Sequence, residues 1–266
     1  MDIRNMASNQ LLFTTVKIYG KDRAGEIISG TGFFYAFNSN GEGKTFNALI
    51  TCRHVMKDLV EAYLCLHLGT FKKDVSHISM QEAIRRKVAN LTNSVVYHKD
   101  DNVDLCGIPL NLLKVEAPPG EALSPVIMNI PDNFTVSDDK LIDLTPIEDV
   151  IIIGFPAGLT DNMTCLPVIR RGITAFHPGI DFNGKNLGLL DITAYPGSSG
   201  SPVLIYNQGS YPTQNGIAIG NRAIFLGVLT GYSLGDLNLD RADLHLGAYV
   251  KARALKELKE EMLKLL

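Results

Sequence analysis

Short runs of strand-forming residues, closely spaced along almost the whole chain, constrain the fold more than any other feature. About a dozen such runs are rich in Val, Ile, Phe, Tyr and Thr and are bounded by Gly, Pro, Asn or Asp. Few helical segments separate them, which is typical of antiparallel barrels or sandwiches and not of a doubly wound sheet. We therefore expect an all-β protein. The runs are 11–18, 30–37, 46–51, 60–68, 94–98, 103–110, 149–155, 166–176, 187–193, 202–206, 224–232 and 246–250.

Two segments favour helix instead. Residues 80–88 contain several good helix formers, among them Gln, Glu, Ala and Arg. The C-terminal residues 251–266 carry apolar side chains at three- and four-residue spacing, namely Leu255, Leu258, Met262 and Leu265. We expect this terminal helix to dock on the β-structure; the alternative is an oligomerisation seam.

The composition limits the class of protein. Of the 266 residues, 45% are hydrophobic and 20% charged, which excludes disorder as the main state. The 25 Lys and Arg residues against 28 Asp and Glu residues give a formal net charge of −3, which argues against a nucleic-acid partner bound by a basic surface. No apolar run reaches the length of a membrane span, and none of signal-peptide length precedes Lys17. We expect a cytoplasmic protein without nucleic-acid or membrane partners.

The cysteines and histidines do not indicate a metal centre. Cys52, Cys65, Cys106 and Cys165 form no Cys-x-x-Cys pair, and we interpret them as buried small apolar residues in preference to a disulfide framework. The six histidines show no i, i+4 pair and no cluster with cysteine at ligand spacing. We therefore predict no metal site and no cofactor.

Three segments carry residue types suited to catalysis. His54 follows an apolar run, although a lone histidine there is more often structural. Asp104 begins another apolar run, where a half-buried acid either caps a turn or needs a partner such as an imidazole N–H. Ser199 lies in a Gly-Ser-Ser-Gly turn that leads into a strand. Such a turn is either a plain loop or one that exposes a hydroxyl beside aligned N–H groups, as an acyl-transfer nucleophile requires.

Taken together, these segments resemble the trypsin-like, chymotrypsin-fold serine peptidases. The matching motifs are Thr-x-x-His-Val, then Asp-Leu, then Gly-x-Ser-Gly-x-Pro, in the chain order His, Asp, Ser that this fold uses. Segments 30–34, 149–158 and 227–231 agree with other strands of the family. The second of them resembles the bacterial high-temperature-requirement (Deg-like) branch. We expect this chain to lack that branch's peptide-binding (PDZ) domain, because too few residues follow Ser199.

The resemblance implies two antiparallel six-stranded β-barrels followed by a C-terminal α-helix, all in one peptidase domain. It covers about residues 11–251. The expected division is an N-terminal barrel with the His and Asp (1–115), an inter-barrel connection (116–135), a C-terminal barrel with the Ser (136–250) and an amphipathic helix (251–266).

The resemblance also implies a role for each candidate residue. Ser199 would attack a peptide carbonyl, His54 would take the proton and later deliver it to the leaving amine, and Asp104 would orient the imidazole. The N–H groups of Gly197 and Ser199 would form the oxyanion hole. Ser198 stands where digestive enzymes of the family carry an Asp that pairs with a newly cut N-terminus. Activation by amine insertion is therefore not expected.

Two points remain open within this interpretation. Asp100 and Asp101 are rival candidates for the acid, less suited than Asp104 because they lie in a polar turn. Arg53 beside the histidine is unusual, and the sequence offers no account of it.

The specificity pocket is the least constrained part. The family register places Thr193 at its floor, six positions before the serine, and its wall at Leu229, Thr230 and Gly231. Because Thr193 is neutral, we expect a preference for small or medium apolar side chains, although Asp191 lies close enough in sequence to change this answer. Peptide would bind at the wall by strand addition, and Gly231 would permit close backbone approach.

The sequence therefore predicts a serine endopeptidase that cleaves a protein or peptide substrate through an acyl-enzyme. The polar segment 207–221 is either an idle surface insertion or a regulatory loop that orders the oxyanion hole when an activating protein partner binds. Two alternative functions remain open: a catalytically silent binding module of the same fold that recognises a peptide or protein, and an esterase using the same acyl chemistry.

Overall fold

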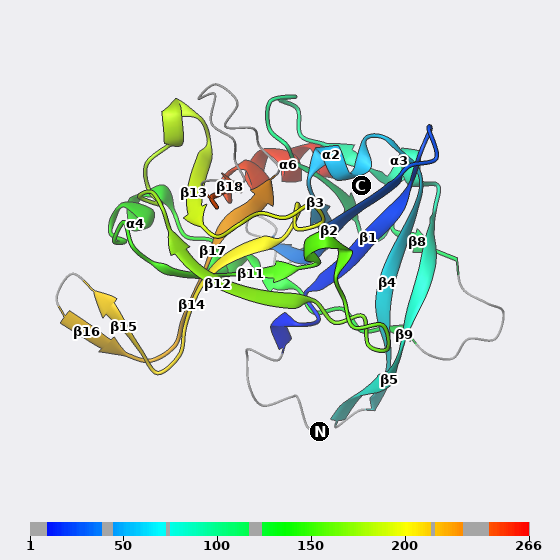
Figure 1. Cartoon of the computed structure of the whole chain (residues 1–266), viewed down its shortest axis with the longest axis horizontal. Helices are drawn as coiled ribbons and strands as arrows, with labels where there is room; N and C mark the ends of the chain where they lie inside the picture. Colours follow the sequence, from blue (N-terminus) through cyan, green and yellow to red (C-terminus); the bar gives the residue numbers. More distant parts are fainter. Residues whose placement is uncertain are drawn as a thin grey trace.

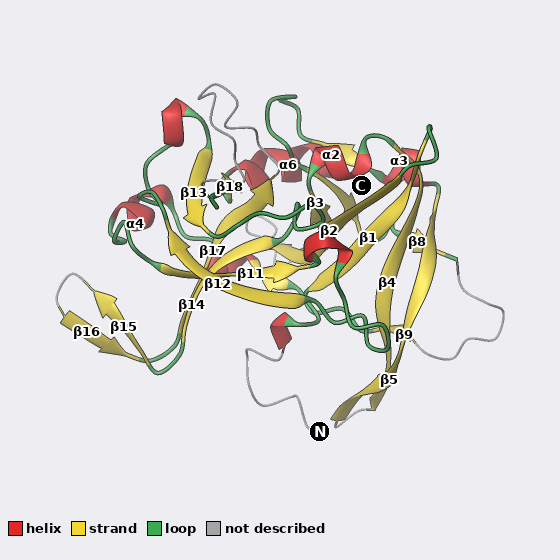
Figure 2. Ribbon diagram, in the orientation of Figure 1, coloured by secondary structure: helices red, strands yellow, loops and turns green. Residues whose placement is uncertain are grey.

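The computed structural model describes residues 10–38, 45–72, 75–116, 124–213, 216–230 and 245–265. These residues form two β-structures with short helical turns around them and one longer helix near the C-terminus (Figure 1, Figure 2). None of the helices in this part of the chain has the length and apolar character needed to cross a membrane. The helical elements are α2 (Arg53–Met56), α3 (Leu91–Ser94), η1 (Asp132–Phe134), α4 (Asp138–Ile142), η2 (Pro156–Gly158), η3 (Phe182–Gly184) and α6 (Ala254–Leu263).

The N-terminal half is a curled ten-stranded sheet (Figure 1). Its strand order is β6-β7-β3-β2-β1-β4-β5-β8, while β9 pairs with β4 and β10 pairs in parallel with β2. The strands are β1 (Thr15–Asp22), β2 (Ile27–Asn38), β3 (Thr45–Thr51), β4 (Leu59–Lys72), β5 (Val75–Ala89), β6 (Val96–Tyr97), β7 (Cys106–Pro109), β8 (Lys114–Val115), β9 (Ser124–Pro125) and β10 (Ile130–Pro131). This half has more strands than the six expected: eight lie on the path above, and β9 and β10, from the segment predicted to connect the halves, pair with β4 and β2.

The C-terminal half is a closed six-stranded barrel in the order β11-β12-β13-β18-β17-β14. Its own core contains Val150, Leu190, Val203 and Leu226, all nearly inaccessible to solvent. The strands are β11 (Asp149–Gly154), β12 (Val168–Thr174), β13 (Leu187–Asp191), β14 (Pro202–Asn207), β17 (Arg222–Thr230) and β18 (Gly247–Lys251). The all-β fold class with a C-terminal helix is therefore confirmed.

One hydrophobic core joins the two halves. Phe33 and Tyr35 of β2 each lie with ring centroids 5.5 Å from Phe225 of β17, and all three side chains are buried. Buried aromatic pairs of this kind contribute about 0.5–1.5 kcal/mol beyond their buried area. The contact holds β2 of the N-terminal sheet against β17 of the C-terminal barrel.

Residues 80–88 form part of β5, and the helix expected there is wrong. The backbone of β5 pairs with β4 in antiparallel register, for example Arg85 with Cys65 and Lys87 with Tyr63. Helix propensity differs among ordinary residues by less than about 0.7 kcal/mol each, so pairing with a long neighbouring strand overrides it.

The C-terminal helix docks on the N-terminal sheet. In α6 the side chains of Leu255, Leu258 and Met262 are buried in the shared core, whereas Leu265 beyond the helix is 55% exposed. Gly107 of β7 makes room for this packing, because a Cβ there would lie 2.4 Å from the Met262 side chain. The apolar stripe of α6 is therefore buried against the core of the same chain.

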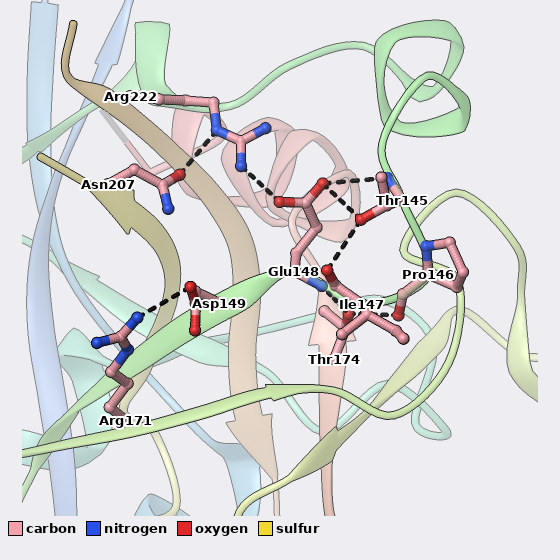
Figure 3. Close-up of polar contacts among 9 residues, drawn as sticks. All are labelled: Thr145, Pro146, Ile147, Glu148, Asp149, Arg171, Thr174, Asn207 and Arg222. Atoms are coloured by element: carbon pink, nitrogen blue, oxygen red, sulfur yellow. Dashed lines mark hydrogen bonds and ion pairs between the residues drawn. The ribbon is translucent and has the colours of Figure 1, made fainter. Parts of the chain in front are cut away.

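The polar segment 207–221 contains a two-stranded hairpin, β15 (Ser210–Thr213) with β16 (Gly216–Ile219). It projects from the barrel at the lower left of Figure 1. At its base, Arg222 donates to Glu148 at 2.5 Å and to Asn207 at 2.9 Å (Figure 3). Glu148 is 2% exposed and also accepts hydrogen bonds from Thr145. This buried network anchors the hairpin to the barrel.

Two of the four cysteines differ from expectation. Cys65 of β4 and Cys165, which precedes β12, form a disulfide across 100 residues of sequence. Their spacing could not reveal the pair, because it depends on how the barrel lies against the sheet. Cys52 and Cys106 are free and fully buried, as expected of small apolar residues.

Candidate active site

Strand pairing brings His54 and Asp104 together. In the antiparallel pair β3–β7, Thr51 lies opposite Cys106, so the chain leaving β3 and the chain entering β7 share one end of the sheet. His54 follows Thr51 by three residues in α2, and Asp104 precedes Cys106 by two. Two residues 50 positions apart in sequence therefore become neighbours.

Two hydrogen bonds join His54 to Asp104. The backbone N–H of His54 donates to Oδ1 of Asp104 at 2.9 Å, and His54 Nδ1 lies 2.6 Å from Oδ2. The Thr230 hydroxyl donates to the same Oδ2 at 2.5 Å. Burial raises the pKa of Asp104, but the bonds from His54 and Thr230 outweigh it and hold the pKa below its usual value. The carboxylate is therefore ionised and keeps the proton of the neutral imidazole on Nδ1.

The rival acids have other partners. Asp101 is strongly exposed and pairs with Arg53 at 2.5 Å, and Asp100 accepts hydrogen bonds from Asn102. Arg53 also donates to the backbone carbonyl of His98 and lies over the ring of Tyr97. The arginine thus fixes the turn that precedes Asp104.

The serine turn is held from both halves of the molecule. The carbonyl of Ser199 accepts a hydrogen bond from the N–H of Thr31 in β2 at 2.9 Å, and the Thr31 hydroxyl donates to the carbonyl of Gly197. On the other side, the N–H of Gly200 donates to the carbonyl of Leu229 at 2.8 Å. The turn cannot move without breaking contacts to β2 and β17.

Glycine is required on both sides of Ser198 and Ser199 in this turn. Gly197 and Gly200 have φ angles of +87° and +91°, which other residues rarely adopt. A Cβ on Gly197 would lie 2.5 Å from the carbonyl of Phe155, and one on Gly200 would lie 1.9 Å from that of Thr31. Within the described part of the chain, the N–H groups of Gly197 and Ser199 donate to no backbone carbonyl.

The serine and histidine lie on adjoining segments. Thr51, three residues before His54, donates its hydroxyl to the carbonyl of Thr31, whose N–H binds Ser199. Among the described residues, no hydrogen bond joins Ser199 Oγ to the His54 ring. Nucleophile–base bonds are often long in unliganded enzymes and tighten when substrate binds. Ser198 is buried, and its hydroxyl has no hydrogen-bond partner among the residues that the structure describes.

Some of the residues predicted to form the specificity pocket are buried or hydrogen-bonded to other parts of the chain. The Thr193 hydroxyl lies 3.2 Å from His245, and its carbonyl accepts from Arg170. Leu229 and Thr230 are buried, and β18 pairs with both. The ladder between β14 and β17 ends at Val228, and Leu229 is hydrogen-bonded instead to Gly200 and Ser201. Gly231 lies outside the described residues.

A third side chain lies beside the His54–Asp104 pair, and no sequence pattern indicated it. The sulfur of Cys52, the His54 nitrogen and an Asp104 oxygen all lie within 4.8 Å of one another. Cys52 is fully buried, and its Sγ donates to the carbonyl of Leu229 at 3.2 Å. Burial and the neighbouring Asp104 raise the pKa of Cys52, so the free protein holds a neutral thiol there.

Comparisons with known proteins bear on this site. The model of the trypsin-like peptidase domain family matches residues 30–210. The solved structure of HL collagenase has a TM-score of 0.54 at 10% identity, covering 96% of this chain and 95% of that one, which shows likeness of fold alone. The active form of the Rv3671c protease from M. tuberculosis gives 0.49 at 16% identity, over 98% of this chain and 85% of its own. No curated protein sequence matches the chain.

Proposed function

The chain belongs to the trypsin-like peptidase domain family, and on this premise we propose that it is a serine endopeptidase with Ser199, His54 and Asp104 as its catalytic triad. The observation that carries the proposal is the 2.6 Å contact between His54 Nδ1 and the ionised Asp104 carboxylate. This contact leaves the unprotonated Nε2 of the neutral imidazole free to act as a base.

The proposed reaction follows from these positions. Ser199 Oγ attacks the substrate carbonyl while Nε2 of His54 takes its proton, and Asp104 stabilises the resulting imidazolium. The N–H groups of Gly197 and Ser199 bind the oxyanion, and loss of one such donor typically costs about 2.7–4 kcal/mol. His54 then protonates the leaving amine, and water hydrolyses the acyl-enzyme.

Labelling with a fluorophosphonate probe tests the nucleophile. We expect wild-type protein to be labelled and Ser199→Ala and His54→Ala to remain unlabelled. Ser198→Ala is the matched control, because the neighbouring hydroxyl is buried and should not react. Labelling that persists in Ser199→Ala, or disappears only in Ser198→Ala, would refute the assignment.

Turnover measurements identify which acid is catalytic and separate an endopeptidase from the alternative functions. Asp104→Asn should lower kcat by about 10⁴-fold with the fold intact, since the imidazole then adopts the wrong tautomer, whereas Asp101→Asn should have little effect. Cleavage of a small ester without cleavage of a protein substrate would favour an esterase. Binding of a peptide without labelling or turnover would favour a silent binding module.

Control of activity is the least constrained part of the proposal. Ser198 supplies no carboxylate for an inserted N-terminal amine, so we propose that activation by amine insertion is not used. Because Ser199 and His54 are not hydrogen-bonded here, substrate or an activating protein partner has to bring them together. Turnover by the purified chain alone would assign that role to substrate; labelling that appears only with a second protein would assign it to a partner.

The hairpin β15–β16 offers a test of the regulatory loop. It projects away from α2, which carries His54 (Figure 1), so we propose that basal activity does not depend on it. Gly209 and Gly220 are joined by a backbone hydrogen bond of 2.9 Å, which allows residues 210–219 to be replaced by a two-residue Asn-Gly turn. A loss of basal activity in this variant would reverse the proposal.

A further inference from the structure

We propose that Cys52, His54 and Asp104 form a binding site for Zn²⁺ or a similar divalent cation, and that occupation of this site inhibits the enzyme. The binding itself depends only on the three side chains. Its inhibitory effect rests on the proposed function, because it requires His54 to be the catalytic base.

The geometry is close to that of a zinc site. Zinc lies about 2.3 Å from a thiolate sulfur and about 2.0–2.2 Å from imidazole nitrogen or carboxylate oxygen, so tetrahedral ligand atoms are about 3.2–3.6 Å apart. Here His54 Nδ1 and Asp104 Oδ2 are 2.6 Å apart, and the Cys52 sulfur lies within 4.8 Å of a ring nitrogen of His54 and a carboxylate oxygen of Asp104. Shifts of about 1 Å would bring all three atoms to ligand distance.

Charge and access also suit a divalent cation. A Cys52 thiolate and the Asp104 carboxylate together carry two negative charges, which neutralise one divalent ion at a buried position. The side chains of His54 and Asp104 are 39% and 22% exposed, so solvent reaches two of the three ligand residues, while Cys52 is buried beside them. Water or the Thr230 hydroxyl, which already contacts Asp104, could complete the tetrahedron. Mixed sulfur, nitrogen and oxygen ligands favour zinc over magnesium or calcium.

Binding would inhibit through the imidazole tautomer. The proposed mechanism needs the proton of neutral His54 on Nδ1, where it bonds to Asp104, and a lone pair on Nε2. A cation on Nδ1 requires the lone pair there, so the ring proton moves to Nε2. The Cys52 thiol releases its own proton to solvent. With Nε2 protonated, His54 cannot accept the proton of Ser199, and the cation need not block the substrate.

Cd²⁺ titration of the Ser199→Ala variant tests binding without any need for activity. Cd²⁺ bound to a thiolate produces an ultraviolet charge-transfer band, and Cys65 and Cys165 are silent because they are disulfide-bonded. We expect the band at one Cd²⁺ per chain in Ser199→Ala. It should persist when Cys106, the other buried free thiol, is changed to Ala, and it should disappear with Cys52→Ala. Absence of the band, or its loss with Cys106→Ala alone, would overturn the site.

Inhibition is then measured with Zn²⁺, relative to the metal-free activity of each variant. Wild type and Cys106→Ala should be inhibited reversibly, with recovery on chelation. Cys52→Ala should need at least about tenfold more Zn²⁺, since even loss of an outer partner of a ligand weakens metal affinity 10–100-fold. Cys52→Ser serves as a second variant that fills the same space. Equal sensitivity of Cys52 and Cys106 variants would overturn the inhibitory site. If the wild type cleaves nothing but shows the Cys52-dependent band, the proposed function fails while the metal site stands.

Discussion

The hydroxyl of Thr230 and the Oδ2 atom of Asp104 are 2.5 Å apart, and this oxygen also lies 2.6 Å from His54 Nδ1. Thr230 ends β17 of the C-terminal barrel, whereas Asp104 lies two residues before β7 of the N-terminal sheet. The hydrogen bond therefore ties the acid to the half of the molecule that carries Ser199, so the two halves are held in the register that the site needs.

Thr230→Val should lower kcat/KM about tenfold. A hydrogen bond to a charged group contributes roughly 1.5–3 kcal/mol, and its loss leaves the Asp104 carboxylate less well stabilised and less well positioned. Steady-state kinetics measure the effect. Thr230→Ser is the control, because it keeps the hydroxyl and should retain most of the activity. Equal rates for the Val variant and wild type would show that the contact does not matter.

The closeness of His54 and Asp104 could be predicted from the sequence, because each residue borders an apolar run within a recognisable motif. What the sequence could not reveal depends on contacts between distant segments. Cys52 sits one residue after β3 and is indistinguishable in sequence from a core cysteine, yet pairing of β3 with β7 places it beside Asp104. Residues 80–88 satisfy helix propensity, and only the presence of β4 alongside makes them a strand.

Loss of the Cys65–Cys165 disulfide should destabilise the protein by about 2–5 kcal/mol. The bond closes a loop of 100 residues, and restricting the unfolded chain over that length contributes about 4.7 kcal/mol in the chain-entropy treatment. Urea unfolding of a Cys65→Ser/Cys165→Ser double variant measures it. Dithiothreitol should destabilise the wild type to the same extent and leave the double variant unchanged; an equal effect on both would refute the role of the bond.

The same bond bears on the compartment. Disulfides persist in oxidising environments and are rare in the cytosol. A Cys65–Cys165 bond recovered from cells under conditions that block thiol exchange would therefore count against the cytoplasmic location that the sequence led us to expect.

His67 should make the protein less stable in mild acid. Burial lowers the pKa of His67 from 6.5 to about 4 in the folded state, and its ring packs edge-on against Phe13. Below pH 6.5 the unfolded chain takes up a proton that the folded protein does not, so this contribution to stability is complete above pH 6.5 and is lost progressively towards pH 4. The full loss is about 3 kcal/mol.

The prediction is checked by measuring the free energy of unfolding at pH 7 and pH 4.5. In His67→Leu the drop between these two values should be smaller than in the wild type by about 2 kcal/mol. An equal drop in both proteins would assign the acid sensitivity to other groups.

Arg222→Met should destabilise the barrel without lowering the activity of the folded protein. Glu148 is 2% exposed and pairs with Arg222, so removing the arginine leaves a buried carboxylate without its cation, which costs about 3–5 kcal/mol (Figure 3). Glu148→Gln combined with Arg222→Met should be more stable than Arg222→Met alone, because no unpaired charge remains. Urea unfolding of the three proteins measures both effects.

Activity separates this network from the site. Arg222 begins β17 and Thr230 ends it, and eight residue steps of about 3.3 Å place them roughly 26 Å apart. We therefore expect kcat/KM per folded molecule to be unchanged in Arg222→Met when it is measured well below the unfolding transition. A selective fall in kcat/KM would mean that the strand transmits the disturbance from Glu148 to the Thr230–Asp104 hydrogen bond, and the rigid barrel assumed here would have to be abandoned.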